Sequence, residues 1–122
     1  MSQTATKTLR TLISAATSNS AGGTTTSTVW DLRTAFGGIL TIKITNGATG
    51  PTELAVARVQ ISGDNSNWKT HLTFVGPNGN NAVGEYSPPI HDGIMYLRVV
   101  VDSNTGQAVT CEAFGQEFTS VG

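Results

Sequence analysis

The sequence predicts an all-β fold: an antiparallel β-sandwich of seven or eight strands, with either an immunoglobulin-like or a jelly-roll topology. Three observations lead to this prediction. Apolar and polar residues alternate with a period of two in several short segments, and turn-forming residues separate these segments at regular intervals. No helical pattern is longer than about one turn, near residues 31–36.

The N-terminal residues 1–27 are expected to form an arm, with a first strand near residues 8–15. The polar tract 17–28 follows (TSNSAGGTTTST), a composition typical of a flexible linker. Residues 28–122 are expected to form the sandwich core, with weaker strands near 26–32 and 82–86. A chain of 122 residues leaves no room for a second domain.

Five further strands are predicted from clear alternation: residues 39–45, 54–61, 68–74, 94–101 and 108–114. In the third of these, Trp68 alternates in phase with Leu72 and Phe74, which predicts a core position for the indole. In the fourth, Met95 alternates in phase with Leu97 and is likewise expected in the core.

Turn-forming residues lie between these strands, as in Asn46-Gly47 and in the segments 63–67, 76–79 and 102–106. The last segment joins two strong strands, so residues 94–101 and 107–114 are predicted to pair as an antiparallel hairpin. Pro88-Pro89 lacks two backbone donors and is expected outside a central strand.

The composition is unusual because only 12% of the residues are charged, against roughly a quarter in an average domain. Seven Lys and Arg against eight Asp and Glu cannot supply the positive surface that nucleic-acid binding requires. The sequence contains no run of about 18 apolar residues, which a membrane-spanning segment would require. Thr, Gly, Ser and Asn make up 51 of the 122 residues, which suits a surface that hydrogen-bonds to neighbouring subunits.

No arrangement of residues in the sequence indicates an active site, a cofactor or a metal, so the chain is expected not to be an enzyme. His71 and His91 share no metal-binding motif, and residues 64–67 lack the carboxylates of a calcium loop. The single Cys111 cannot form an internal disulfide and is expected to be buried.

Ile94, Tyr96 and Val100 would form a second apolar face on their strand, and such a face requires cover. A partner or the N-terminal arm could provide it. The arm itself, residues 1–10, is expected to lie across neighbouring subunits. The predicted partner-contact residues are therefore Lys7, Arg10, Trp30, Ile94, Tyr96 and Arg98.

Several segments resemble small structural proteins encoded in the head genes of tailed bacteriophages. They are VWDLRTAFGG at 29–38, residues 40–52, VQISGDNSNW at 59–68 and residues 93–101. The resemblance implies a virion β-sandwich of the capsid decoration or cement type, made in the host cytoplasm. Such a protein binds the major capsid protein from outside, as a dimer or trimer, and stabilises the shell.

Two alternatives remain open from the sequence. One is another virion component, such as a head–tail connector, a tail tube or a baseplate protein. The other is a carbohydrate-binding module that stacks sugar rings on Trp30 or Tyr96.

Overall fold

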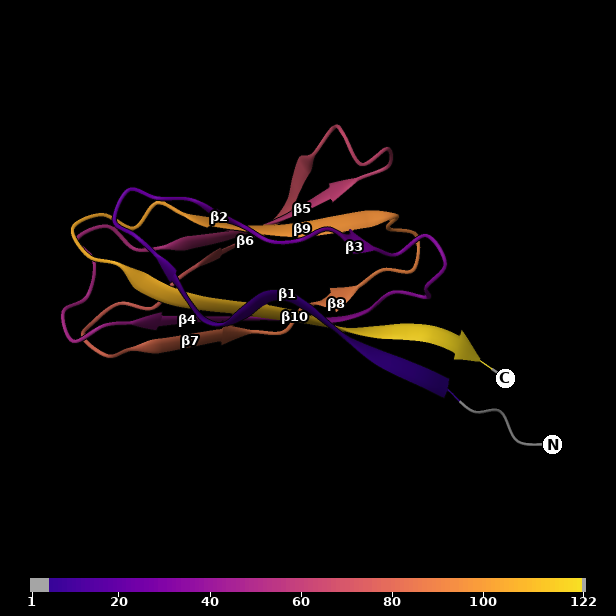
Figure 1. The fold of residues 1–122 in the computed structure, drawn as a ribbon, viewed down its shortest axis with the longest axis horizontal. Helices are drawn as coiled ribbons and strands as arrows, with labels where there is room; N and C mark the ends of the chain where they lie inside the picture. The colour runs from indigo at the N-terminus through magenta and orange to yellow at the C-terminus, as the bar shows by residue number, and fades with distance from the viewer. Residues whose placement is uncertain (1–4, 122) are drawn as a thin grey trace.

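The computed structural model describes residues 5–121, which form two antiparallel sheets packed face to face (Figure 1). Sheet A has the strand order β1-β10-β4-β7, with β8 also beside β4. Its strands are β1 (Ala5–Asn19), β4 (Gly38–Asn46), β7 (Val83–Tyr86), β8 (Pro89–Ile90) and β10 (Val109–Val121). The predicted antiparallel sandwich is confirmed.

Sheet B has the strand order β2-β9-β5-β6, with β3 also beside β9. Its strands are β2 (Thr25–Thr26), β3 (Trp30–Asp31), β5 (Val56–Ser62), β6 (Lys69–Val75) and β9 (Tyr96–Asp102). No helix in the described residues is long and apolar enough to cross a membrane.

The strand order identifies the topology as a jelly roll. β2 and β3 both pair with β9, and β7 and β8 both pair with β4, so each pair acts as one interrupted strand. The ten strands thereby reduce to the eight of a jelly roll, in two four-stranded sheets. Along the chain every connection crosses between the sheets, except the one that joins β5 to β6.

The hairpin predicted between residues 94–101 and 107–114 is wrong, because β9 lies in sheet B and β10 lies in sheet A. Asn104 explains the crossing. Its fully buried side-chain Nδ2 donates to the carbonyl oxygens of Asn19, Ser20 and Gln107. These bonds tie the connection to the end of β1, so the chain passes across the roughly 10 Å between the sheets.

The polar tract is held in place within the chain and is not a free linker. The Asn19 side chain donates to Asn104 Oδ1 at 2.6 Å and to the Gly23 carbonyl oxygen at 3.1 Å, and it accepts from Thr25 Oγ1 at 2.7 Å. The Gly22 amide donates to the Asn104 carbonyl oxygen. These bonds satisfy the buried amides, which would otherwise destabilise the fold.

The core lies between the sheets and is built from the alternating positions that the sequence predicts. Leu40, Ile42 and Ile44 of β4 face Val59, Leu97 and Val99 of sheet B, and all are fully buried. Burial of each such side chain contributes about 1.5–3 kcal/mol. Cys111 is also buried in this core.

The predicted core positions of Trp68 and Met95 are wrong. In the β5–β6 pair, Val59 faces Leu72 but Gln60 faces Thr70, so one extra residue enters β6 at this point. The bulge moves the side chains that precede it in β6 to the opposite face of the sheet from the one that the alternation predicts. Trp68 therefore lies on the outer face of sheet B. Met95 precedes the start of β9 and is exposed.

β1 and β10 continue as a two-stranded ribbon past the rest of the sandwich (Figure 1). Residues 5–10, expected to lie across neighbouring subunits, pair with residues 115–121 of the same chain. Residues 1–4 of the expected arm lie outside the described residues.

Candidate interaction surfaces

A buried carboxylate connects three strands at the base of the ribbon. Glu117 of β10 is only 3% exposed. Its Oε1 accepts a hydrogen bond from Trp30 Nε1 at 3.0 Å, and its Oε2 accepts from Arg10 Nε and Nη2 at 3.1 and 3.0 Å. Because both oxygens are satisfied, the charge can remain in the interior.

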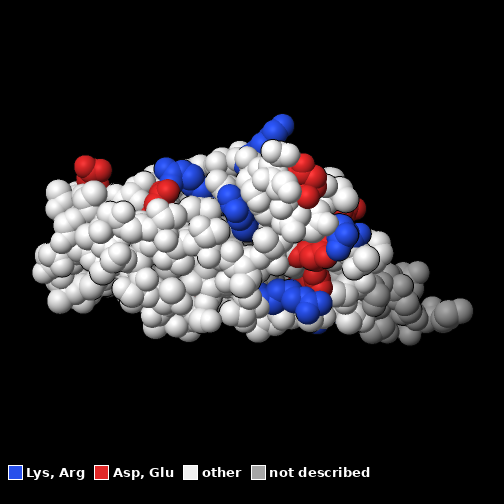
Figure 2. All heavy atoms as spheres, turned by 45° about the horizontal axis from the view of Figure 1, so that its top comes forward, with Lys and Arg blue, Asp and Glu red and all other residues white. Residues whose placement is uncertain are grey.

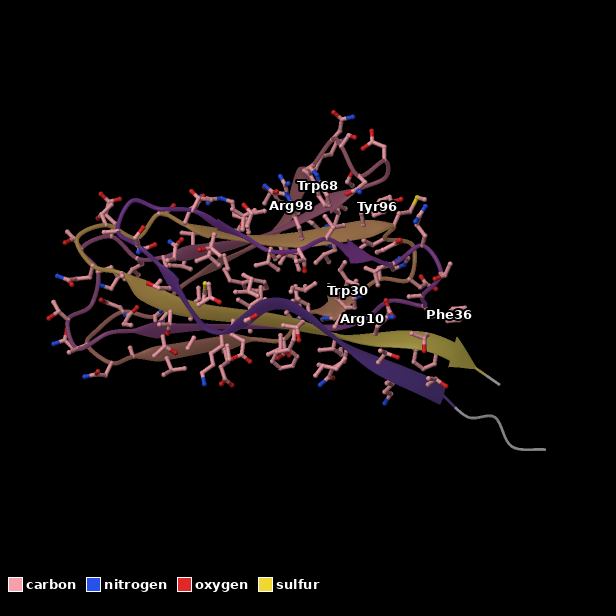
Figure 3. All side chains as sticks on the ribbon, viewed as in Figure 1. Arg10, Trp30, Phe36, Trp68, Tyr96 and Arg98 are labelled. Atoms are coloured by element: carbon pink, nitrogen blue, oxygen red, sulfur yellow. The ribbon has the colours of Figure 1, made fainter. Side chains whose placement is uncertain are left out.

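Two of the predicted contact residues, Arg10 and Trp30, belong to this cluster (Figure 3). The Trp30 indole is buried, so a partner on the surface cannot stack on it. The Arg10 side chain is half exposed and lines a groove of about 530 Å³ with Thr28, Asp31 and Thr34. Its guanidinium is nevertheless engaged by Glu117.

Tyr96 and Arg98 lie on the outer face of sheet B, where this chain itself covers part of their side chains. The Arg98 guanidinium lies 4.4 Å from the centre of the Trp68 ring, and its Nε donates to Gln60 Oε1 at 2.7 Å. The Arg33 guanidinium lies 5.1 Å from the centre of the Tyr96 ring. The Arg33 contact occupies one face of the Tyr96 ring, on which a sugar ring would stack in the carbohydrate-binding alternative.

Arg33 is itself held by Asp31, through a 2.8 Å ion pair. Hydrogen bonds from the Arg33 side chain and backbone lower the pKa of Asp31 to about 2. The second apolar face expected at Ile94, Tyr96 and Val100 is therefore not open: Ile94 packs against the core and Val100 is buried.

The outer face of sheet A carries an apolar patch that the sequence patterns do not predict. It consists of Leu9, Phe36, Ile39, Phe114 and Phe118, and we call it the sheet A patch. Leu9 is 63% exposed, Phe36 is 55% exposed and Ile39 is 37% exposed. Phe114 and Phe118 alternate in phase along the strand and could have indicated this patch, but the strand was predicted to end at residue 114.

Lys7 lies at the border of this patch, directly opposite Phe118 in the β1–β10 pair. It is the one predicted contact residue that is both exposed and beside a large apolar surface. Elsewhere the charged groups are sparse, and on the face shown in Figure 2 most blue and red groups lie beside one another.

The described residues contain no group of three or more His, Cys, Asp and Glu side chains that could hold a metal ion. Asp64 serves its own turn: its carboxylate accepts from the amides of Asn67 and Ser66 and from the side chains of Asn67 and Ser62, which lowers its pKa. The Nδ1 of exposed His91 accepts from the Gly93 amide in a turn.

No protein-family model matches the sequence, and no curated protein matches it. Solved structures do match the fold. A chain of the T13 IBDV viral particle aligns with a TM-score of 0.58 and 10% identity, over 93% of this chain and 31% of that one. PRD1 vertex protein P5 aligns with a TM-score of 0.55 and 15% identity, over 94% and 99% of the two chains.

The SPBc2 prophage-derived protein YomS aligns with a TM-score of 0.51 and 14% identity, over 93% of this chain and 95% of that one. Phage and viral proteins are thus prominent among the structures that share this fold. Non-viral proteins share it too, such as an adhesin domain of Lys-gingipain from Porphyromonas gingivalis. At these identities the likeness establishes the fold, a jelly-roll sandwich similar to several virion and prophage proteins.

Proposed function

We propose that this chain is a non-enzymatic structural protein of a virion, of the capsid decoration or cement type. In this role it lies on the capsid surface, binds the major capsid protein and stabilises the shell. The observation that carries the proposal is the sheet A patch, where Leu9 and Phe36 are each more than half exposed. An apolar surface of this kind in a weakly charged protein is typical of an assembly interface.

Two further observations support the proposal. The jelly-roll fold resembles PRD1 vertex protein P5 over nearly the whole of both chains. Two carboxylates that could act in catalysis are instead engaged in structural contacts: Glu117 with Arg10 and Trp30, and Asp64 within its turn.

The mechanism is multivalent clamping. Each copy contributes a modest contact through its apolar surface, and copies that associate as dimers or trimers bind several capsid subunits at once. Binding at the second site is then intramolecular, and the effective concentration raises the overall affinity by about 10²–10⁴.

The test is to mix purified protein with capsids assembled without it and to count the copies bound at increasing concentration. Saturable binding, with a higher temperature of capsid disassembly, is the expected result. Absence of saturable binding would overturn the decoration role. If the protein alone forms rings or tubes instead, a connector or tail-tube role replaces the decoration role.

A further inference from the structure

We propose that the sheet A patch and Lys7 together form the docking surface for the capsid protein, and that they receive an apolar segment carrying a carboxylate. This inference rests on the proposed function and adds to it the surface and the chemistry of the partner. The argument starts from the strand register, which brings the residues together.

In an antiparallel pair, directly opposite residues point to the same face of the sheet. The β1–β10 register places Lys7 opposite Phe118, Leu9 opposite Gln116 and Thr11 opposite Phe114. The β10–β4 register then places Ile39 opposite Gln116. These side chains therefore occupy adjacent positions on three neighbouring strands.

Phe36 joins the patch from the loop before β4. Its amide donates to the Phe118 carbonyl oxygen at 2.7 Å, and the Phe118 amide donates to the Gly37 carbonyl oxygen at 3.0 Å. The two rings meet edge to face, with centres 5.9 Å apart. The backbone bonds hold an exposed aromatic ring in a fixed position, so binding requires little ordering.

The patch contains two hollows. One hollow, of about 310 Å³, is lined by Lys7, Phe36, Ile39 and Phe118. The other, of about 230 Å³, is lined by Leu9 and Phe114 together with Glu112. Two hollows in an apolar patch fit apolar side chains that protrude from a partner.

Charge decides which partner fits. Of the seven Lys and Arg residues, Arg10, Arg33, Lys43 and Arg58 form ion pairs with carboxylates, and Arg98 lies over Trp68. Within the described residues Lys7 has no carboxylate within 4 Å. A partner that presents an acidic side chain among apolar ones would supply the missing carboxylate.

A second copy of this chain is a poorer occupant. In a contact between two copies through the patch, an acidic partner for Lys7 would have to come from the same face of the other copy. Two acidic residues on this face already lie beside Lys43: Glu112 is opposite it in the β10–β4 pair, and Glu85 forms an ion pair with it. Glu117 points inward and is occupied by Arg10 and Trp30.

The experiment compares variants of the patch with matched variants elsewhere, using capsids assembled without this protein as the probe. The patch variants are Lys7→Glu, Leu9→Ser and Phe36→Ser. The controls are Lys69→Glu and Val75→Ser on β6 of sheet B, because Lys69 also lacks an ion pair within the described residues and Val75 is 57% exposed. Thermal melting establishes that each variant is folded.

We expect each patch variant to bind capsids about tenfold more weakly or worse, with the controls close to wild type. If wild type binds and Lys7→Glu binds equally well, the docking surface is wrong while the proposed function stands. If wild type does not bind, both fail. A Leu9→Ser variant that loses only self-association, measured by sedimentation equilibrium, would identify the patch as a contact between copies and overturn the inference. Lys7→Glu keeps the test decisive if an apolar variant does not fold.

Discussion

Gly115 of β10 lies directly against the indole ring of Trp30, with no room for a side chain between them. A Cβ atom at residue 115 would stand 2.4 Å from Cη2 of Trp30 and 2.6 Å from its Cζ3. The absence of a side chain at Gly115 therefore allows the Trp30 indole, the largest core side chain, to reach Glu117. Glu117 is the only buried carboxylate in the described residues.

Gly115→Ala is expected to destabilise the protein by about 2 kcal/mol or more, because the rigid indole must move and its hydrogen bond to Glu117 must lengthen. Urea unfolding followed by tryptophan fluorescence measures this change. Gly63→Ala serves as the control, since a Cβ there would meet no atom within 4 Å. Equal stability of the two variants would contradict the packing argument.

Trp30→Phe tests the hydrogen bond that the indole donates to Glu117. The phenyl ring is apolar and smaller than the indole, and Oε1 of the buried Glu117 carboxylate loses its hydrogen-bond donor. This loss should lower the free energy of unfolding by about 1–3 kcal/mol. Combining this change with Glu117→Gln should give much less than the sum of the two single effects, because a neutral amide tolerates the loss better. Additive effects in the double-mutant cycle would show that the two side chains are not coupled.

The stability of the β5–β6 hairpin is expected to depend on pH through Asp64. Hydrogen bonds from the amides of Asn67 and Ser66 lower the pKa of this carboxyl in the folded state. Because the pKa of the Asp64 carboxyl is lower in the folded state than in the unfolded state, its stabilising contribution is complete above the unfolded-state pKa. This contribution is lost as the pH falls towards the folded-state pKa. Asp31, whose pKa is about 2, acts in the same direction.

The melting temperature should therefore fall as the pH is lowered from about 4 towards 2. Asp64→Asn should have a lower melting temperature than wild type at pH 7 and a smaller decline below pH 4. Circular dichroism melts at pH 7, 4, 3 and 2 measure both differences. A decline equal to that of wild type would exclude Asp64 as a contributor.

The Cys111 thiol is expected to react only when the protein unfolds. Burial raises the pKa of this thiol, and the thiolate is the reactive form. With a disulfide reagent at pH 8, native protein should remain unmodified, while the rate should rise with urea in parallel with the loss of tertiary structure. Rapid modification of the native protein would show that this part of the core opens locally.

The sequence predicted the strands whose alternation is regular and whose neighbours are apolar, such as β4 with Leu40, Ile42 and Ile44. It could not predict the phase of Trp68, because one extra residue in β6 reverses which face the chain presents. It also could not assign β9 and β10 to different sheets, since that depends on the buried contact of Asn104 with Asn19, 85 residues away.

The residues of the candidate interaction surfaces were predicted less well than the strands, because they too depend on contacts between distant parts of the chain. Arg10 and Glu117 lie 107 residues apart, and neither has a neighbour in sequence that indicates an ion pair. Lys7 was identified from its charge, whereas the Phe118 ring opposite it became visible only through the strand register. Patches that combine distant strands depend on long-range pairing, which local patterns do not encode.

The pairing of β1 with β10 also determines when the protein can fold. β10 lies between β1 and β4, so sheet A cannot close until residues 109–121 have left the ribosome. Closing a loop of about 100 residues costs roughly 4 kcal/mol of chain entropy before any contact compensates for it. Folding should therefore be slow and follow the synthesis of β10, and the edge of β4 that β10 covers would be open to aggregation until then.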